Sequence, residues 1–192
     1  MSLALIRSRL PSLRQVRWAS GLVLWCYVAL HLGNHATGLV SLQVADALLE
    51  VISSGWHSVP GTVLLYGALL THLALAGVAL WQRRSLRMPW VEGVRLALGL
   101  CLPLLLAGHF VATRWAFESM GASPPYGRMV NGLARPENLV LQSLLLITAW
   151  WHGCLGLHMA MRGRPGWRRW QPALLTGAVL LPVLAALGRV SM

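Results

Sequence analysis

The stretch "ALHLGNHATGL" (Ala29–Leu39) decides how this chain is interpreted, because it sets two histidines inside a run that otherwise has the composition of a membrane span. His31 and His35 are four residues apart, about one helical turn, so they share one face of a helix. Ligand-capable side chains are costly inside a membrane, so each one needs a reason. The stretch predicts a membrane helix and leaves open whether both histidines, one or neither hold a ligand.

Around this stretch the whole chain has a membrane composition. Of its 192 residues 56% are hydrophobic and 11% are charged, and the mean hydropathy is +0.60. A span needs about 20 apolar residues. Five stretches approach or exceed that length, the fifth being the shortest: Trp18–Val40, Pro60–Trp81, Leu96–Phe117, Leu139–Met161 and Pro172–Leu187. We therefore expect one all-α, polytopic membrane domain over residues 1–192 with five transmembrane helices.

The basic residues set the expected orientation. All sixteen are arginine, against five acidic residues, which gives a net charge of +11. Twelve arginines precede the first span or lie at the connections that follow the second and fourth spans, and four lie on the opposite side. This is the positive-inside pattern, and it predicts a cytoplasmic N-terminus. Because this pattern accounts for the charge, we expect the lipid bilayer and not a nucleic acid as partner.

The connections and cysteines carry weaker signals. Residues 41–59 are expected outside the membrane, with a short amphipathic turn around Val44–Ile52. In residues 118–138, prolines and glycines are expected to break any helix. No internal repeat is apparent. The three cysteines are isolated, which excludes a cysteine zinc site, an iron–sulfur cluster and covalent haem attachment within this chain.

Histidines recur on four consecutive expected spans. His57 falls in an outer connection, where a solvated or interfacial position is expected, and the other six lie on the spans: His31, His35, His72, His109, His152 and His158. Depth follows from about 1.5 Å of rise per residue, counted from the inner end of each span. His31 and His109 are thirteen residues from Trp18 and Leu96, about 20 Å deep. His72 and His152 are ten residues from Gln82 and Arg162, which directly follow the inner ends of their spans, and so lie about 15 Å deep. Two depth-matched pairs result.

These pairs suit haem better than a bare metal ion. Zinc or copper needs three or four ligands at one depth, often with a carboxylate, and these spans contain no Asp or Glu. Two facing imidazoles suit the axial positions of haem iron, and spans 1/3 and 2/4 are the diagonals of an up-down four-helix bundle. Because crossing diagonals cannot share one depth, two stacked haems are expected in a bundle made by the first four spans.

Four other features carry less weight. His35 would lie about 6 Å further out than His109, and His158 about 6 Å from its inner helix end, so neither matches a partner. Arg114, five residues outward of His109, is a candidate contact for a haem propionate or a quinone, as are His35 and His158. Snorkelling to the interface explains Arg114 equally well, and interfacial packing explains His35 at least as well. Glycines beside the candidate ligands would admit a flat macrocycle: Gly33, Gly108, Gly153 and Gly156.

The segments "HLGN", "THLALAG", "GHFVATR" and "WHGCLGLH" resemble the five-helix, two-haem cytochrome b subunit of succinate:quinone oxidoreductases and fumarate reductases. That resemblance implies His31 and His109 as ligands of one haem and His72 and His152 as ligands of the other.

A closer resemblance, over nearly the whole chain, is to the cytochrome-b-like membrane anchor of bacterial class III adenylate cyclases. It is carried by "ASGLVLWCYVALHLGNHATGLVSL", "PGTVLLYGALLTHLALA", "RRSLRMPWVE", "LPLLLAGHFVATR" and "WHGCLGLHM". It implies two b-type haems, quinone as a further ligand, a bacterial inner membrane and a homodimer. It also implies a cytosolic cyclase domain, often preceded by a ferredoxin-like segment.

Neither ferredoxin cysteines nor cyclase aspartates occur here, so we expect either part of a longer cyclase or a separate anchor with a partner chain. No catalytic site is apparent, so cyclase or quinone oxidoreductase activity would need further domains or subunits. Two alternatives stay open: a working cytochrome b subunit of a quinone oxidoreductase complex, and a haem-free anchor whose histidines hydrogen-bond between helices.

Overall fold

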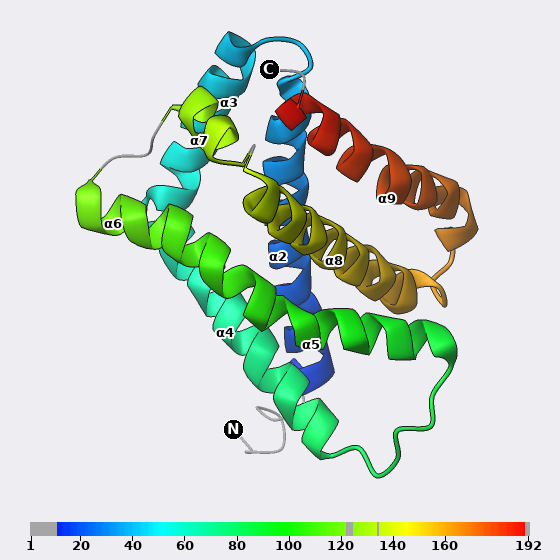
Figure 1. Ribbon diagram of the computed structural model, residues 1–192. Coiled ribbons are helices and arrows are strands. Elements are labelled where there is room, and N and C mark those ends of the chain that lie inside the picture. The colour runs from blue at the N-terminus through cyan, green and yellow to red at the C-terminus, as the bar shows by residue number, and fades with distance from the viewer. Residues whose placement is uncertain (1–10, 122–124, 134, 191–192) are drawn as a thin grey trace, which may run out of the picture.

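The computed structural model describes residues 11–121, 125–133 and 135–190, and over these ranges it is helical without strands (Figure 1). The elements are α2 (Leu13–Thr37), α3 (Leu42–His57), α4 (Val59–Trp81), α5 (Trp90–Phe110), the π-helix η1 (Val111–Trp115), α6 (Ala116–Met120), α7 (Tyr126–Leu133), α8 (Pro136–Met161) and α9 (Trp167–Val190).

Within the described ranges, four helices are long and apolar enough to cross a membrane. They are Val59–Trp81, Trp90–Ser119, Pro136–Met161 and Trp167–Gly188, the second of which runs without a break from α5 through η1 into α6. They indicate a multi-pass membrane protein. The last of the four contains the stretch expected to be the weakest span, and its 22 residues are long enough to cross.

The helix expected as the first span, α2, is not among these four, although its 25 residues extend over about 37 Å. It packs against α4, α8 and α9, so much of its surface meets protein. Ser20 and Asn34 are buried there, which is where polar side chains of membrane helices are usually found. Helix α2 can therefore be less apolar than the four candidate spans, because its polar side chains face other helices of the protein.

A compact apolar core joins α2, α8 and α9. It contains Leu32, Leu146, Trp150, Cys154 and Ala185. Trp25 of α2 stacks on Trp150 with ring centres 5.5 Å apart. This core fixes α2 against α8 and thereby sets the positions of the histidines that both helices carry.

Pro182 lies inside α9, and one tryptophan of α8, Trp151, compensates for its missing N–H. A proline has no N–H, so the carbonyl of Ala178, four residues earlier, loses its helical partner. The indole N–H of Trp151 donates to that carbonyl at 3.2 Å, and the indole N–H of Trp150 donates to the carbonyl of Gly177 at 3.2 Å.

The connections expected on the outer side of the membrane contain more helix than the sequence predicts. Residues 41–59 form a full helix, α3, and the expectation that residues 118–138 would break any helix is wrong, because α7 lies within them. Tyr126 at the start of α7 is fully buried, and its backbone N–H donates to Asp46 Oδ1 of α3 at 2.6 Å. Docking on α3 thus overrides the poor helix propensity of Gly127 and Gly132.

The elements divide between two ends of the bundle. The helices α3 and α7 and the C-terminal end of α9 lie at one end (Figure 1). The N-terminal end of α2 and the connection between α4 and α5 lie at the other (Figure 1).

The four histidine-bearing helices pack as two pairs. Helix α2 packs along α4, α5 packs along α8, and α2 also contacts α8. Within the described residues neither α2 and α5 nor α4 and α8 pack directly against each other. Helices on a diagonal are therefore separated, and only long side chains reach across.

Candidate cofactor site: two cross-helix histidine pairs

We call His72 of α4 and His152 of α8 the inner pair, because the sequence predicts that they lie nearer the cytoplasmic side than His31 and His109. Their ring centres lie 6.3 Å apart and the ring planes are nearly perpendicular, at 88°. The two helices do not pack directly on each other, so these rings meet across the space between them. The depth count from sequence predicts this encounter.

Hydrogen bonds to backbone carbonyls orient both inner rings. Nδ1 of His72 lies 3.1 Å from the carbonyl oxygen of Arg17 in α2, and Nδ1 of His152 lies 2.9 Å from that of Arg95 in α5. A carbonyl oxygen only accepts, so Nδ1 donates in each bond and Nε2 is the nitrogen suited to bind a metal. This is the usual orientation of a metal-ligating histidine, whose second nitrogen donates to a carbonyl or a carboxylate.

Two glycines make room for the inner rings. A Cβ atom on Gly21 of α2 would lie 2.9 Å from Cε1 of His72, and one on Gly99 of α5 would lie 2.6 Å from Cε1 of His152. Each ring therefore approaches a neighbouring helix with its Cε1–Nδ1 edge, at a position where a side chain is absent. Sequence reasoning selected other glycines: a Cβ on Gly33, Gly108 or Gly156 would meet no atom within 4 Å, and Gly153 makes room for Trp25.

A spacing that is repeated in α2 and α5 underlies this arrangement. From the sequence we expected no internal repeat and did not identify this spacing. Helix α2 carries Arg17, Gly21 and His31, and α5 carries an arginine, a glycine and a histidine at the same spacing, Arg95, Gly99 and His109. In each helix the arginine carbonyl and the glycine hold one inner histidine, and the histidine itself belongs to the outer pair. Comparing the two apolar spans residue by residue would have found this signal.

The outer pair consists of His31 of α2 and His109 of α5, with ring centres 5.8 Å apart and an interplanar angle of 78°. Nδ1 of His109 lies 2.9 Å from Oε1 of Gln142 in α8. His31 also stacks parallel to Tyr27, at 6.1 Å and 8°. Both depth-matched pairs thus form in space, whereas the role of the four histidines as haem ligands stays a prediction.

His35 belongs to the outer end but not to the cross-helix pair. Its ring meets His31 edge-on at 4.8 Å, and its Nδ1 lies 2.9 Å from the hydroxyl oxygen of Tyr126. This buried tyrosine is a contact that sequence reasoning did not identify, because α7 was not expected to form.

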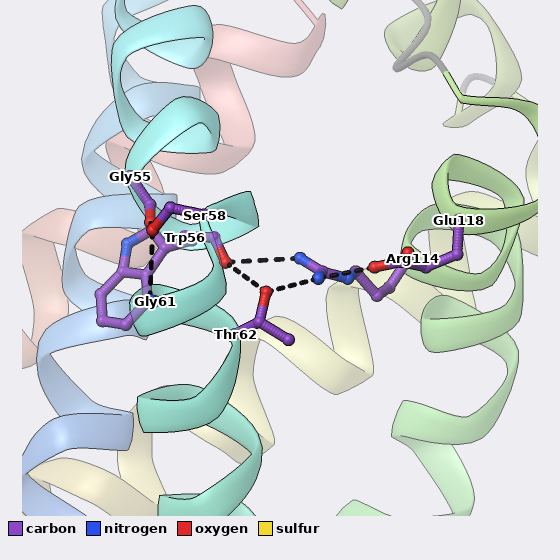
Figure 2. Close-up of polar contacts among 7 residues, drawn as sticks. All are labelled: Gly55, Trp56, Ser58, Gly61, Thr62, Arg114 and Glu118. Carbon is purple, nitrogen blue, oxygen red and sulfur yellow. Dashed lines mark hydrogen bonds and ion pairs between the residues drawn. The ribbon is translucent and has the colours of Figure 1, made fainter.

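Arg114 lies in the π-helix η1, and its side chain is only 11% exposed. Figure 2 shows its guanidinium reaching the turn between α3 and α4, where it donates to the hydroxyl of Thr62 at 2.8 Å and to the carbonyl of Trp56 at 3.4 Å. It also pairs with Glu118 at 2.6 Å and lies over the ring of Tyr66. Arg114 therefore ties the end of the α5 helix to the α3–α4 turn and does not extend outward as an isolated cation.

His57 and His158 lie apart from both pairs. His57, at the C-terminal end of α3, packs on Phe117 with ring centres 3.9 Å apart. Burial, reinforced by the positive charge of Arg114 and opposed by Glu118, lowers the pKa of His57 below its usual 6.5. His158 meets Trp167 at 5.7 Å near the inner end of α8, and its Nδ1 is buried without a hydrogen-bond partner among the described residues.

The pair distances fit two imidazoles on opposite sides of one metal atom. A metal–imidazole bond is about 2.0–2.1 Å and a ring nitrogen lies about 1.1 Å from the ring centre, so such rings have centres about 6.3 Å apart. The observed distances are 6.3 and 5.8 Å. Over residues 11–121, 125–133 and 135–190 no three His, Cys, Asp or Glu side chains gather as a metal-binding group. Each pair therefore offers two protein ligands, which suits a metal whose remaining ligands come from a macrocycle.

Comparison of the chain with family models, curated proteins and solved structures found no match in any of the three.

Proposed function

We propose that this chain is a di-haem, b-type electron-transfer or redox-sensing module of the membrane. His31 and His109 would bind the outer haem, and His72 and His152 would bind the inner haem. The observation that carries the proposal is the inner pair. Its ring centres lie 6.3 Å apart between two helices that do not pack on each other, and each Nδ1 donates to a backbone carbonyl. A second pair of rings, those of His31 and His109, meets across α2 and α5 with centres 5.8 Å apart.

The proposed topology has five spans, with α2 as the first and its N-terminal end on the cytoplasmic side. The central position of α2 between three apolar helices supports a fifth crossing, and the arginine distribution supports the orientation. By resemblance, the membrane is the bacterial inner membrane.

Each part of the chain has a defined task in this proposal. The carbonyls of Arg17 and Arg95 hold the inner imidazoles in one tautomer, and Gln142 orients His109. The apolar helices around the pairs exclude water and lower the local dielectric constant. Bound haem would supply one-electron chemistry. A haem held by two histidines would have no ligand position left for oxygen, which favours electron transfer or sensing.

The partners of the module follow from the family resemblance. Our leading proposal is the anchor of a class III adenylate cyclase that responds to the quinone pool and works as a homodimer. The alternative is a cytochrome b subunit of a succinate:quinone oxidoreductase or fumarate reductase. Cyclase and ferredoxin-like sequence after α9 would support the first, and adjacent genes for flavoprotein and iron–sulfur subunits the second.

The deciding experiment is the dithionite-reduced-minus-oxidised absorption spectrum of the purified protein, with haem quantified per chain. We expect the sharp α-band of low-spin b haem and two haems per chain. Absence of that band would refute the proposal and leave the histidines as hydrogen-bonding links between helices.

Single substitutions then test the ligand assignment. His31→Ala is expected to remove one haem, whereas His35→Ala is expected to retain both, because His35 pairs with Tyr126 and only abuts His31. Loss of a haem with His35→Ala but not with His31→Ala would reverse the assignment. His35, Arg114 and His158 stay candidates for propionate or quinone contact. Arg114 has a protein partner for its charge in Glu118, which lessens its need for such a ligand.

A further inference from the structure

Two arginines lie at equivalent positions beside the inner histidine pair. Arg17 and Arg95 occupy the same place in the spacing repeated in α2 and α5, and the carbonyl of each receives the hydrogen bond of one inner ring. Both side chains are half-buried and start from the backbone at the level of that pair. The repeat therefore places the backbone of one arginine beside each ring of the inner pair.

The charges of these arginines are only partly balanced within the described chain, where Glu92 attracts Arg95 without forming an ion pair with it. Their guanidinium groups act electrostatically on each other, and both act on His72. Among the described residues neither makes an ion pair, and Nε of Arg95 is buried without a hydrogen-bond partner. The nearby carboxylate of Glu92 is already paired with Arg83 at 2.9 Å.

Two neighbouring cations away from bulk water are unfavourable unless an anion joins them. The anion that suits them carries two carboxylates, because guanidinium binds carboxylate through two parallel N–H···O bonds. The group proposed at the inner pair, haem b, has two carboxylate side chains of this kind. Spacing, charge and location therefore indicate the same ligand.

We infer that Arg17 and Arg95 form a two-armed clamp for the carboxylates of the cofactor held by His72 and His152. This inference rests on the proposed function. At the other end of the bundle, the charge of Arg114 is already paired with Glu118, and its guanidinium also donates to Thr62. The clamp consequently distinguishes the inner cofactor from the outer one: the two positive charges favour its reduced form and raise its midpoint potential.

The test is a potentiometric titration of the purified full chain, with haem content measured in parallel. His72→Ala first identifies the inner component of the titration. Arg17→Gln and Arg95→Gln are each expected to lower the midpoint of that component and to leave the outer midpoint unchanged. Arg17→Lys and Arg95→Lys keep the charge and are expected to restore most of the shift. Arg14→Gln removes an equal charge from an exposed position on α2 and serves as the matched control.

Each outcome decides the inference. Two results would support the clamp: a lower midpoint of the inner haem in the Gln variants, or selective loss of the inner haem from them with the outer haem retained. Two haems with midpoints shifted no more than in Arg14→Gln would overturn the clamp and leave the proposed function standing. If the Lys variants and the Gln variants all lose both haems, the arginines have a purely structural role, and the clamp is also overturned. A wild-type chain without haem would refute the proposed function itself.

Discussion

Gly99→Ala tests the geometry of the inner pair most directly, because it adds one methyl group at the point of closest approach. The new Cβ would lie 2.6 Å from Cε1 of His152 and 3.0 Å from its Nδ1, whereas ordinary contacts begin near 3.4 Å. The ring or the helix must therefore move by about 0.8 Å. The same change at Gly21, 2.9 Å from Cε1 of His72, requires about 0.5 Å.

The expected magnitude combines two opposing effects. Overpacking in a tight interior costs about 1–3 kcal/mol. Replacing glycine by alanine within a helix returns about 0.5–1 kcal/mol. We expect Gly99→Ala to destabilise the fold by roughly 1–2 kcal/mol and Gly21→Ala by less, because its displacement is smaller.

Thermal unfolding in detergent, followed by tryptophan fluorescence, measures this loss of stability. Gly77→Ala on α4 is the matched control, because a Cβ at Gly77 would meet no atom within 4 Å. A shift of about 0.8 Å also strains the bond from His152 Nδ1 to the Arg95 carbonyl. If the proposed haems are bound, the band of the inner haem should therefore broaden or weaken while that of the outer haem is kept. If Gly99→Ala proves as stable as Gly77→Ala with an unchanged spectrum, His152 does not lie against α5 and the orientation argument is wrong.

Three further predictions address the surroundings of the site. Arg114→Gln should lower stability by about 1–3 kcal/mol in a denaturant or thermal series, because it removes a charge-assisted contact that joins η1 to the α3–α4 turn; an unchanged stability would contradict that link. Trp151→Phe should cost about 0.5–1.5 kcal/mol in wild type but less in a Pro182→Ala background, where a restored N–H can satisfy Ala178; equal costs in a double-mutant cycle would reject this compensation. Because the pKa of His57 is lowered in the fold, the unfolded chain takes up its proton first: stability should be full above pH 6.5 and fall as the pH drops below it, and His57→Phe should flatten that fall in melting curves recorded from pH 8 to 5.

Much of the bundle could be predicted from local sequence. Apolar length alone predicts the helices that became α4, α5, α8 and α9, because a bilayer accepts only segments that satisfy their own backbone hydrogen bonds. Helical rise alone matches His31 with His109 and His72 with His152 in depth, since a fixed rise per residue converts position into height. These inferences need no knowledge of which helices are neighbours.

The surroundings of the pairs depend on which helices are neighbours, and only the tertiary structure decides that. Gly21 and Gly99 matter because the rings of other helices lie against them, and the Arg17 and Arg95 carbonyls matter because those rings turn toward them. Tyr126 reaches His35 across 91 positions of sequence, from a helix whose first residue docks on α3. Local sequence thus fixes the height and kind of each candidate ligand. The packing of separate helices decides what holds it, since those contacts join residues that no local pattern connects.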